Sequence, residues 1–346
     1  MIAFLLKRVA WAIGVVLVLT FITYLIFFPG LRAAGLDPAR LATNKTSTPQ
    51  TVANARKFLG LDHPWTYQYG TFLLRLVRGP SPLEQEVSSG QADRLGFSFR
   101  NRLGVGHLVV SRFAVTLGLV LGAAVLWLGF AVFFGVAAAL RPRGWIDRAC
   151  SVFTGALAGV PVYLIGFTLL YLVAYVPTTG SFLGLHFGSF TLLPLVGYSS
   201  LRLSDPWPWA QHLILPWIAL ALAMVTLYFR LMRAEMLSAL DQDYVRTARA
   251  KGLDERQIAL RHALRNALPP VATLFGLDFG ILLGGVVLVE TVFGIPGLGS
   301  LALTSVLNLD VPTATGVIFF AGVLVVVVNL AVDVLQALLD PRVRYA

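Results

Sequence analysis

The sequence predicts an all-α membrane protein with about six transmembrane helices, and three observations support this fold class. Residues of the AVILMFWYC set make up 57% of the 346 residues, and charged residues make up only 13%. Soluble domains typically contain roughly 45–50% apolar and about 25% charged residues. Several apolar runs exceed the ~18 residues at which a membrane span becomes the expected structure. The basic residues lie between these runs, where the loops of a membrane protein are expected.

Six apolar segments are long enough to cross a hydrocarbon core of ~30 Å at a rise of about 1.5 Å per residue. The expected helices cover residues 9–29, 113–140, 149–176, 213–232, 269–292 and 313–338. The first run is longer than the apolar core of a typical signal peptide, which has about 7–15 residues, so we expect it to be retained. Pro161 lies inside the third segment and predicts a kink, because proline leaves one helix carbonyl without its donor.

The Lys and Arg residues predict the orientation, because short cytoplasmic loops of membrane proteins are enriched in them. If the helices alternate, four basic segments face the same side, and both termini are expected in the cytoplasm. The net charge of +10 then follows from membrane topology, and no nucleic acid partner is expected. The residues are Lys7, Arg8, Arg141, Arg143, Arg148, Arg230, Arg233, Arg246, Arg249, Lys251, Arg256, Arg261, Arg265, Arg342 and Arg344.

The chain divides into four expected regions. Residues 1–30 hold an N-terminal cytoplasmic segment and the first helix, and residues 31–112 form an extracytoplasmic segment with short helices. Residues 113–338 form a five-helix core that contains a cytoplasmic loop at 234–268, and residues 339–346 form a cytoplasmic tail.

Two patterns stand out in the extracytoplasmic segment. Thr48 followed by Pro49 predicts the start of a short amphipathic helix outside the membrane, and Gly60 predicts its end. Residues 79–89 are rich in Pro, Ser, Glu and Gly and predict a mobile loop.

Two short helices are predicted in the cytoplasmic loop. Asp241 and Asp243 begin the first, and Gly252 follows the basic residues at its end, in agreement with the helix dipole and a left-handed C-cap. Asp254 and Gln257 form an Asp-x-x-Gln version of the capping box that starts the second. A short helix held by a tight turn is a rigid knob; the alternative is an ordinary solvated loop.

The fifth apolar segment carries signals for its start and its packing. Pro269 and Pro270 suit only the first turn of a helix and predict that the helix begins there. Gly276, Gly280 and Gly284 recur every four residues, so one helix face lacks side chains and can approach a partner helix closely.

Three acidic residues fall within or near the predicted spans. Asp278, Glu290 and Asp333 are candidate pore or gate residues, since an acidic group in a membrane is expected to face protein or water. Two roles remain open for each of them: contact with a water-filled path, or an interhelical hydrogen bond that only fixes packing.

Residues 243–253 (DYVRTARAKGL) and 261–267 (RHALRNA) together resemble the cytoplasmic-loop signature of bacterial ABC importer permeases of the dipeptide and oligopeptide type. Residues 290–293 (ETVF) with 296–299 (PGLG) resemble the turn after the fifth helix in that family. Residues 340–345 (DPRVRY) resemble the tail of its B-type subunit, and the resemblance covers nearly the whole chain. Arg-Thr-Ala stands at 246–248, where the general importer motif has Glu-Ala-Ala, as in the peptide-type variants.

The resemblance implies a type I ABC importer permease fold in the bacterial inner membrane, with this chain forming half of the translocation pore. It implies a coupling helix that docks in a groove on a separate ATPase. Ala248 would allow close packing, Gly252 the turn, and the basic residues a charged contact. The implied coupling residues are Tyr244, Arg246, Thr247, Ala248, Arg249, Lys251, Gly252 and Leu253.

The implied partners are a second homologous permease, two ATPase subunits, an extracytoplasmic substrate-binding protein and membrane lipid. No Gly-x-x-x-x-Gly-Lys-Ser/Thr stretch occurs in the sequence, so ATP and magnesium are expected on the partner and no cofactor or metal in this chain. No catalytic constellation is evident, and an enzyme is not expected. Alternatives are a permease of this type for nickel, glutathione or haem, and an ion-driven secondary transporter.

Overall fold

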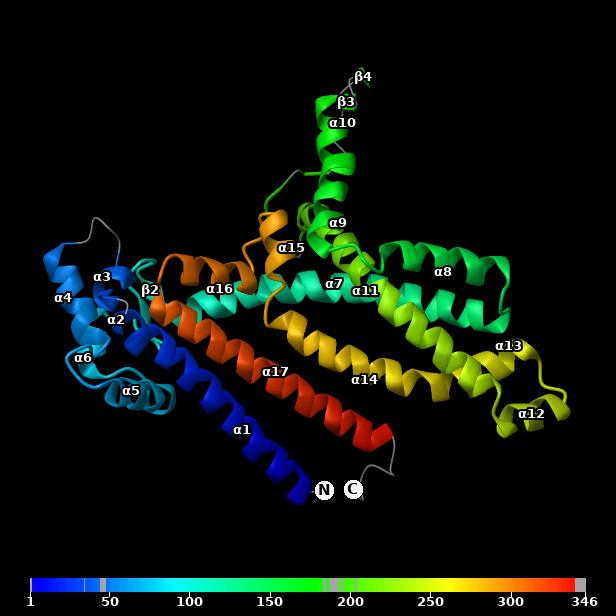
Figure 1. The fold of residues 1–346 in the computed structure, drawn as a ribbon, viewed down its shortest axis with the longest axis horizontal. Helices are drawn as coiled ribbons and strands as arrows, with labels where there is room; N and C mark the ends of the chain where they lie inside the picture. The colour runs from blue at the N-terminus through cyan, green and yellow to red at the C-terminus, as the bar shows by residue number, and fades with distance from the viewer. Residues whose placement is uncertain are drawn as a thin grey trace. The chain divides into compact units, whose positions relative to one another are not determined.

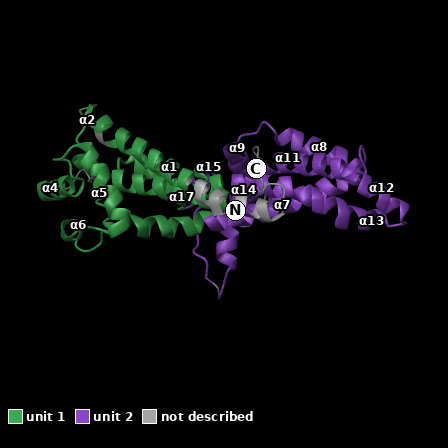
Figure 2. Cartoon of the chain, turned by 90° about the horizontal axis from the view of Figure 1, so that it is seen from below, with its two compact units in different colours: residues 1–116, 280–287, 296–330 green, residues 117–279, 288–295, 331–346 purple. Residues whose placement is uncertain are grey.

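The computed structural model shows a helical chain with two short β-hairpins (Figure 1). It describes residues 2–33, 35–43, 48–182, 185–186, 193–194, 196–202 and 204–339. The tail that resembles a B-type subunit, residues 340–345, lies outside the described residues. The chain forms two compact units, of which unit 1 comprises residues 1–116, 280–287 and 296–330, and unit 2 comprises residues 117–279, 288–295 and 331–346 (Figure 2).

Unit 1 contains the N-terminal helix, the short elements that follow it, the helix α16 and the first part of the last helix. The elements are α1 (Ile2–Leu25), a π-helical turn (Ile26–Gly30), α2 (Leu31–Ala33), α3 (Pro38–Ala42), α4 (Pro49–Phe58), α5 (Trp65–Arg78), α6 (Pro82–Val87), β1 (Phe97–Ser98), β2 (Leu103–Gly104), α16 (Leu298–Leu307) and the first part of α17 (Val311–Leu339). β1 and β2 pair antiparallel, with Phe97 opposite Gly104. The helix α7 (Val105–Leu140) begins in unit 1 and continues into unit 2.

Unit 2 contains the central helices and the loop of interest. The elements are α8 (Trp145–Leu157), α9 (Val162–Leu169), the π-helix η2 (Leu170–Tyr175), α10 (Val176–Thr179), β3 (Ser181–Phe182), β4 (Leu185–His186), α11 (Trp207–Leu240), α12 (Asp243–Ala250), α13 (Glu255–Gln257), the π-helix η3 (Ile258–Ala263), most of α14 (Leu264–Leu283) and most of α15 (Val287–Val292).

Within the described residues, five helical stretches are long and apolar enough to cross a membrane. They are Val105–Leu140, Val162–Thr179, Trp207–Leu240, Glu255–Leu283 and Val311–Val332, and Ile13–Leu25 forms a shorter apolar helix. The predicted all-α membrane fold is confirmed. Most helices are longer than their predicted spans, because the ends extend beyond the apolar residues that identify them.

The third predicted helix, residues 149–176, is broken in the structure. α8 ends at Leu157, and Pro161 is the N-cap of α9 with an extended backbone (φ −60°, ψ 140°). The predicted kink at Pro161 inside one helix is therefore wrong. A proline steers the residue before it, here Val160, away from the helical region, so a break is favoured over a bend.

The start and end predicted for the fifth helix are also wrong. Pro269 and Pro270 lie inside α14, which continues without interruption from α13 and η3. The carbonyls that lose helical donors belong to Arg265 and Asn266, which are both exposed, so water can replace those bonds. The helix ends at Leu283, before the two glycines that precede α15.

The segment between α1 and α7 is more ordered than the sequence predicted. Thr48 caps α4 by accepting a hydrogen bond from the backbone N–H of Thr51, which confirms the predicted helix start. The prediction of a loop at residues 79–89 is wrong, because α6 occupies most of it. Ser81 and Glu84 form a capping box that starts this helix.

The helix α7 begins eight residues before the predicted position 113, at Val105. Its first free N–H groups are capped from a distance by Asp93, whose Oδ2 accepts hydrogen bonds from the backbone N–H groups of Gly106 (2.6 Å) and His107 (3.3 Å). The other carboxylate oxygen accepts from Leu95 and Gly96. A cap from outside the local sequence extends the helix beyond its apolar stretch.

Candidate functional site

The helix α12 connects the end of α11 to α13 (Figure 1). Gln242 is its N-cap residue and Asp243 its first residue, so a carboxylate stands where the helix dipole favours negative charge. The next element starts at Glu255, and the N-cap Asp254 accepts a hydrogen bond from the backbone N–H of Arg256 (3.2 Å). The first predicted short helix is therefore present, and a helix also starts where the second was predicted, but that helix continues through η3 into α14 and is not short.

The turn after α12 is a Schellman C-cap. The N–H of Leu253 donates to the carbonyl of Ala248 (3.3 Å), and the N–H of Gly252 donates to the carbonyl of Arg249 (2.9 Å). Gly252 has φ +77°, the left-handed conformation that this motif requires and that glycine adopts without a Cβ penalty. The predicted left-handed cap at Gly252 is confirmed.

A small apolar core fixes α12 to the π-helix η3. Val245, Ala248 and Ile258 are buried together, and α12 packs directly on η3. Ala248 is therefore part of the loop's internal packing, and its side chain is not on the outer surface. The wide backbone of a π-helix at this position is consistent with a functional site, where such turns are frequently found.

A two-pronged ion pair closes the turn from the solvent side. Nε of Arg249 donates to Oε1 of Glu255 at 2.6 Å, and Nη2 donates to Oε2 at 3.2 Å. Both side chains are about half exposed, so their main effect is geometric: they hold α12 and α13 at a fixed angle.

The remaining face of α12 and its turn is open to solvent. Five predicted coupling residues present exposed side chains there: Tyr244, Arg246, Thr247, Lys251 and Leu253. Arg246 lies 3.6 Å from carboxylate oxygens of both Asp241 and Asp243. An open groove beside Tyr244 is lined by Glu235, Ser238, Ala239, Gln242 and Asn266. The loop thus combines a rigid interior with an exposed surface that carries aromatic, apolar and cationic groups.

An ion pair that the sequence did not reveal anchors the loop between α7 and α8. Nε and Nη2 of Arg233 donate to the two carboxylate oxygens of Asp147 at 2.6 and 2.8 Å. The backbone N–H of Arg143 also donates to Asp147 at 2.8 Å. Hydrogen bonds from Arg233 are the main reason that the pKa of Asp147 lies below its ordinary value.

The membrane-embedded Asp278 takes part in an interhelical hydrogen bond. The hydroxyl of the fully buried Tyr228 in α11 donates to Oδ2 of Asp278 in α14 at 2.8 Å. Trp127 packs beside this pair, with its ring centroid 6.0 Å from that of Tyr228 and 6.3 Å from that of Phe275. The sequence left two roles open for Asp278, and this hydrogen bond supports the role in helix packing.

The other two acidic candidates lie on other helices than Asp278. Glu290 lies fully buried in the short helix α15, not in a long span. Asp333 belongs to α17, but its side chain lies outside the described residues.

The three small-residue positions of the fifth segment face α17. A Cβ at Gly276 would overlap the side chain of Val332, and a Cβ at Gly280 would lie 3.3 Å from Cγ1 of Val328. Gly284 lies in the turn after α14, where a Cβ would be 3.7 Å from that of Ala321. Close helix approach at these glycines is therefore part of the fold.

A set of apolar spans with an exposed, internally packed loop between two of them is the architecture of a multi-pass membrane protein. Residues 131–345 match the binding-protein-dependent transport system inner membrane component family, and residues 1–120 match the family of its N-terminal region. The chain belongs to this family of inner-membrane permeases. The family resemblance identified in the sequence is confirmed.

Proteins similar to this chain share its full length. A peptide transport system permease protein of Brucella abortus (strain 2308) is 37% identical over 347 residues, which covers 100% of both chains. A peptide ABC transporter permease protein of Sinorhizobium fredii (strain NBRC 101917 / NGR234) is 34% identical over 342 residues, 99% of each chain. A glutathione transport system permease protein of Salmonella typhi is 32% identical over 347 residues, 100% of each chain.

Proposed function

We propose that this chain is the permease subunit of an ATP-driven importer for di- or oligopeptides and forms half of its translocation pore. Family membership supports the transport role, and the relatives named as peptide permeases support the substrate class. A full-length relative transports glutathione, itself a small peptide-like molecule, so glutathione is the second candidate substrate.

The coupling proposal rests on one observation, which is that α12 and the turn after it form a rigid knob. A mechanical link must transmit force without deforming, and three independent devices stiffen this loop: the Schellman cap at Gly252, the core around Val245 and the ion pair between Arg249 and Glu255. The exposed side of the knob is free to dock in a groove on a separate ATPase.

In this proposal, some of the coupling residues contact the ATPase and the others maintain the shape of the loop. Tyr244, Arg246, Thr247, Lys251 and Leu253 contact the ATPase. Ala248, Arg249 and Gly252 maintain the shape of the knob, which departs from the expectation that Ala248 itself touches the partner. ATP and magnesium bind the ATPase, where hydrolysis occurs, and this chain contributes no cofactor.

The proposal also implies an orientation of the chain in the membrane and a set of partner subunits. ATP is available in the cytoplasm, so the loop at 234–268 and both termini lie on that side. A second homologous permease completes the pore, two ATPase subunits supply the energy, and an extracytoplasmic binding protein delivers the substrate. Asp278 acts in packing, while Glu290 and Asp333 remain candidates for the pore or gate.

The test is uptake of labelled dipeptide, tripeptide and glutathione by cells that carry or lack this chain. Uptake is measured once with ATP depleted and once with the ion gradient dissipated. ATP-dependent peptide uptake that persists when a protonophore dissipates the ion gradient is expected. Arg246→Glu should abolish it, whereas Arg141→Glu, an exposed charge reversal in another loop, should not. Uptake that follows the ion gradient and ignores ATP would establish a secondary transporter instead.

A further inference from the structure

The helix α5 packs against the part of α1 that lies within the predicted membrane span. The hydroxyl of Tyr69 donates to the carbonyl of Leu17 at 2.9 Å and lies 3.0 Å from Oγ1 of Thr20. The ring of Phe21 lies 5.6 Å from Trp65 and 5.5 Å from Tyr69, between ring centroids. α5 thus begins alongside the second half of α1, not beyond its end.

These contacts indicate the depth of the first turns of α5 in the bilayer. The apolar run of the first span ends at Phe28. At about 1.5 Å per residue, Phe21 and Leu17 lie roughly 10 and 16 Å inside that end. Helices that lie in the membrane interface bury their apolar face by about 5–10 Å. The first turns of α5 are therefore at or below interfacial depth.

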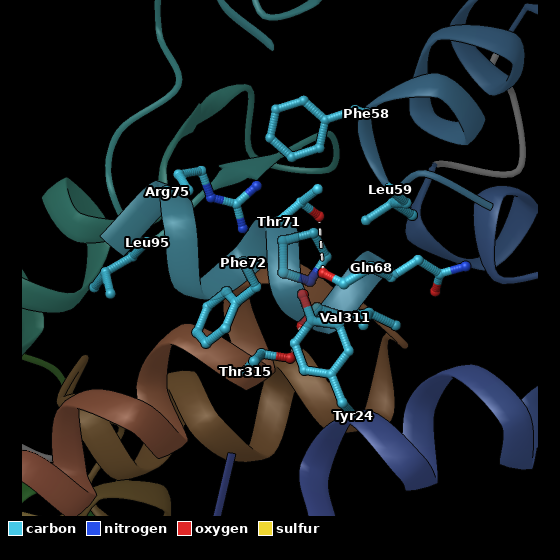
Figure 3. A pocket seen from close by; sticks show the side chains of 11 residues that line it. Tyr24, Phe58, Leu59, Gln68, Thr71, Phe72, Arg75, Leu95, Val311 and Thr315 are labelled. Atoms are coloured by element: carbon cyan, nitrogen blue, oxygen red, sulfur yellow. Dashed lines mark hydrogen bonds between the residues drawn. The ribbon is translucent and has the colours of Figure 1, made fainter. Parts of the chain in front are cut away.

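The inner face of α5 buries polar as well as apolar side chains. Gln68 and Arg75 lie there beside Phe72, and all three are buried in unit 1 (Figure 3). Arg75 pairs with Glu84 at 2.6 Å. The rest of the inner face is apolar and packs against the same core: Tyr69, Leu73 and Leu76. The outer face nevertheless exposes large apolar side chains, with Leu74 52% and Val77 76% exposed. Large apolar side chains that are exposed while polar ones are buried fit a helix whose outer face is not wholly in water.

An open groove beside this face combines apolar and cationic residues. It has a volume of about 440 Å³ and runs between α4, α5 and α6. Its exposed aromatic and aliphatic side chains include Tyr67, Leu74 and Leu83, and Lys57 and Arg78 are exposed at the same groove. The carboxylate of Glu84 also lines it but is already paired with Arg75. An amphiphile with an anionic head fits this arrangement.

We infer that the outer face of α5 and its groove bind a phospholipid of the bilayer. The acyl chain covers Leu74, Val77 and Leu83, and the phosphate lies beside Lys57 and Arg78. Apolar side chains are also exposed on α1 and on the π-helical turn after it, among them Ile22 and Ile26. The inference goes beyond the proposed peptide import and depends on it only for the leaflet involved.

The test places a fluorescent label on α5 in the assembled transporter in lipid vesicles. In a Cys150→Ala background, Val77→Cys and the control Glu86→Cys, an exposed position on α6, each carry an environment-sensitive dye. Lipids brominated on the acyl chain are expected to quench the Val77 label strongly, and aqueous iodide to quench it weakly. The Glu86 label should show the reverse. Quenching of the Val77 label by iodide alone would overturn the inference, and so would shielding from both quenchers, which would indicate a protein partner.

A second measurement tests the headgroup. Brominated phosphatidylglycerol should quench the Val77 label more strongly than brominated phosphatidylcholine at the same mole fraction, because only the former has a net negative headgroup. Each basic residue beside that headgroup should favour the anionic lipid by about fivefold in affinity. Arg78→Gln with Lys57→Gln should remove that preference and leave thermal stability unchanged, since both side chains are exposed. Equal quenching by the two lipids in the unmodified chain would contradict a site for an anionic headgroup at Lys57 and Arg78.

Discussion

Arg233 of α11 holds Asp147 of α8 by two parallel hydrogen bonds of 2.6 and 2.8 Å, one to each carboxylate oxygen. The Asp147 side chain is 6% exposed and that of Arg233 31%. The pair joins the loop after α7 to the helix that leads into α12. It therefore lies within the structural support of the proposed coupling loop.

Asp147→Asn should lower the free energy of unfolding by about 2 kcal/mol, less than the ~3–5 kcal/mol for a fully buried pair because Arg233 is partly solvated. Thermal unfolding in detergent, followed by tryptophan fluorescence, measures the change. Asp241→Asn is the matched control, since its ion pair with Arg246 is long and exposed, and it should have almost no effect. Equal effects of the two substitutions would contradict the structural role of Asp147.

The stability contributed by Asp147 should depend on pH. Its folded-state pKa is lower than the ordinary 3.8, so the unfolded chain binds the proton more readily. The contribution is therefore complete above pH 3.8 and is lost as the pH falls through the lower folded-state pKa. The difference in stability between the unmodified chain and Asp147→Asn should be constant near neutral pH and shrink in strong acid. If the difference in stability between the two proteins instead increased in acid, the lowered pKa of Asp147 would be contradicted.

Tyr228→Phe should lower stability by about 1 kcal/mol, the usual size of an interhelical hydrogen bond in a membrane. Tyr228 is fully buried, and phenylalanine preserves its ring packing against Trp127. Combining it with Asp278→Asn in a double-mutant cycle measures the coupling between the two side chains. Loss of uptake in Asp278→Asn at unchanged stability would instead place Asp278 in the translocation path.

Gly285→Ala should be among the most destabilising glycine substitutions, by more than ~2 kcal/mol. Gly285 has φ +131°, and an added Cβ would lie 2.6 Å from Cα of Gly299. Gly129→Ala in α7 is the control, because nothing lies within 4 Å of its Cβ position, and it should raise stability by about 0.5–1 kcal/mol. Thermal unfolding measures both changes in stability. If Gly129→Ala were more destabilising than Gly285→Ala, the backbone geometry at Gly285 would be contradicted.

Gly252→Val should abolish uptake while membrane insertion stays intact, because a β-branched residue does not fit φ +77°. Gly252→Asn should retain most uptake, since asparagine tolerates the left-handed conformation. Uptake normalised to the amount of protein in the membrane separates coupling from expression. Normal uptake by the valine variant would count heavily against a coupling role for the turn.

Features that depend on neighbouring residues could be predicted from the sequence. The cap at Gly252 and the start of α4 at Thr48 both follow from residue types within one helical turn. The long apolar spans also follow, because hydrocarbon selects continuous helices. The structure confirms these predictions.

Features that depend on distant residues could not be predicted. Asp93 extends α7 by capping it from 13 positions away, and Asp147 meets Arg233 from 86 positions away. The family resemblance implied close packing of Ala248 against the partner, but the sequence does not show that Ala248 is buried with Ile258, 10 positions further along the chain. Pro269 and Pro270 were expected to start a helix, but exposed carbonyls one turn earlier allow the helix to continue through them.

We propose that the α12 knob docks on a separate ATPase. The most direct measurement is purification of the tagged chain from its native membrane in mild detergent, with mass spectrometry of the accompanying proteins. An ATPase and a second permease should accompany the unmodified chain and the Arg141→Glu control. Tyr244→Ala with Arg246→Glu should lose the ATPase and retain the second permease. Retention of the ATPase by this double variant, or recovery of the unmodified chain alone and still active with an ion gradient, would contradict the claim.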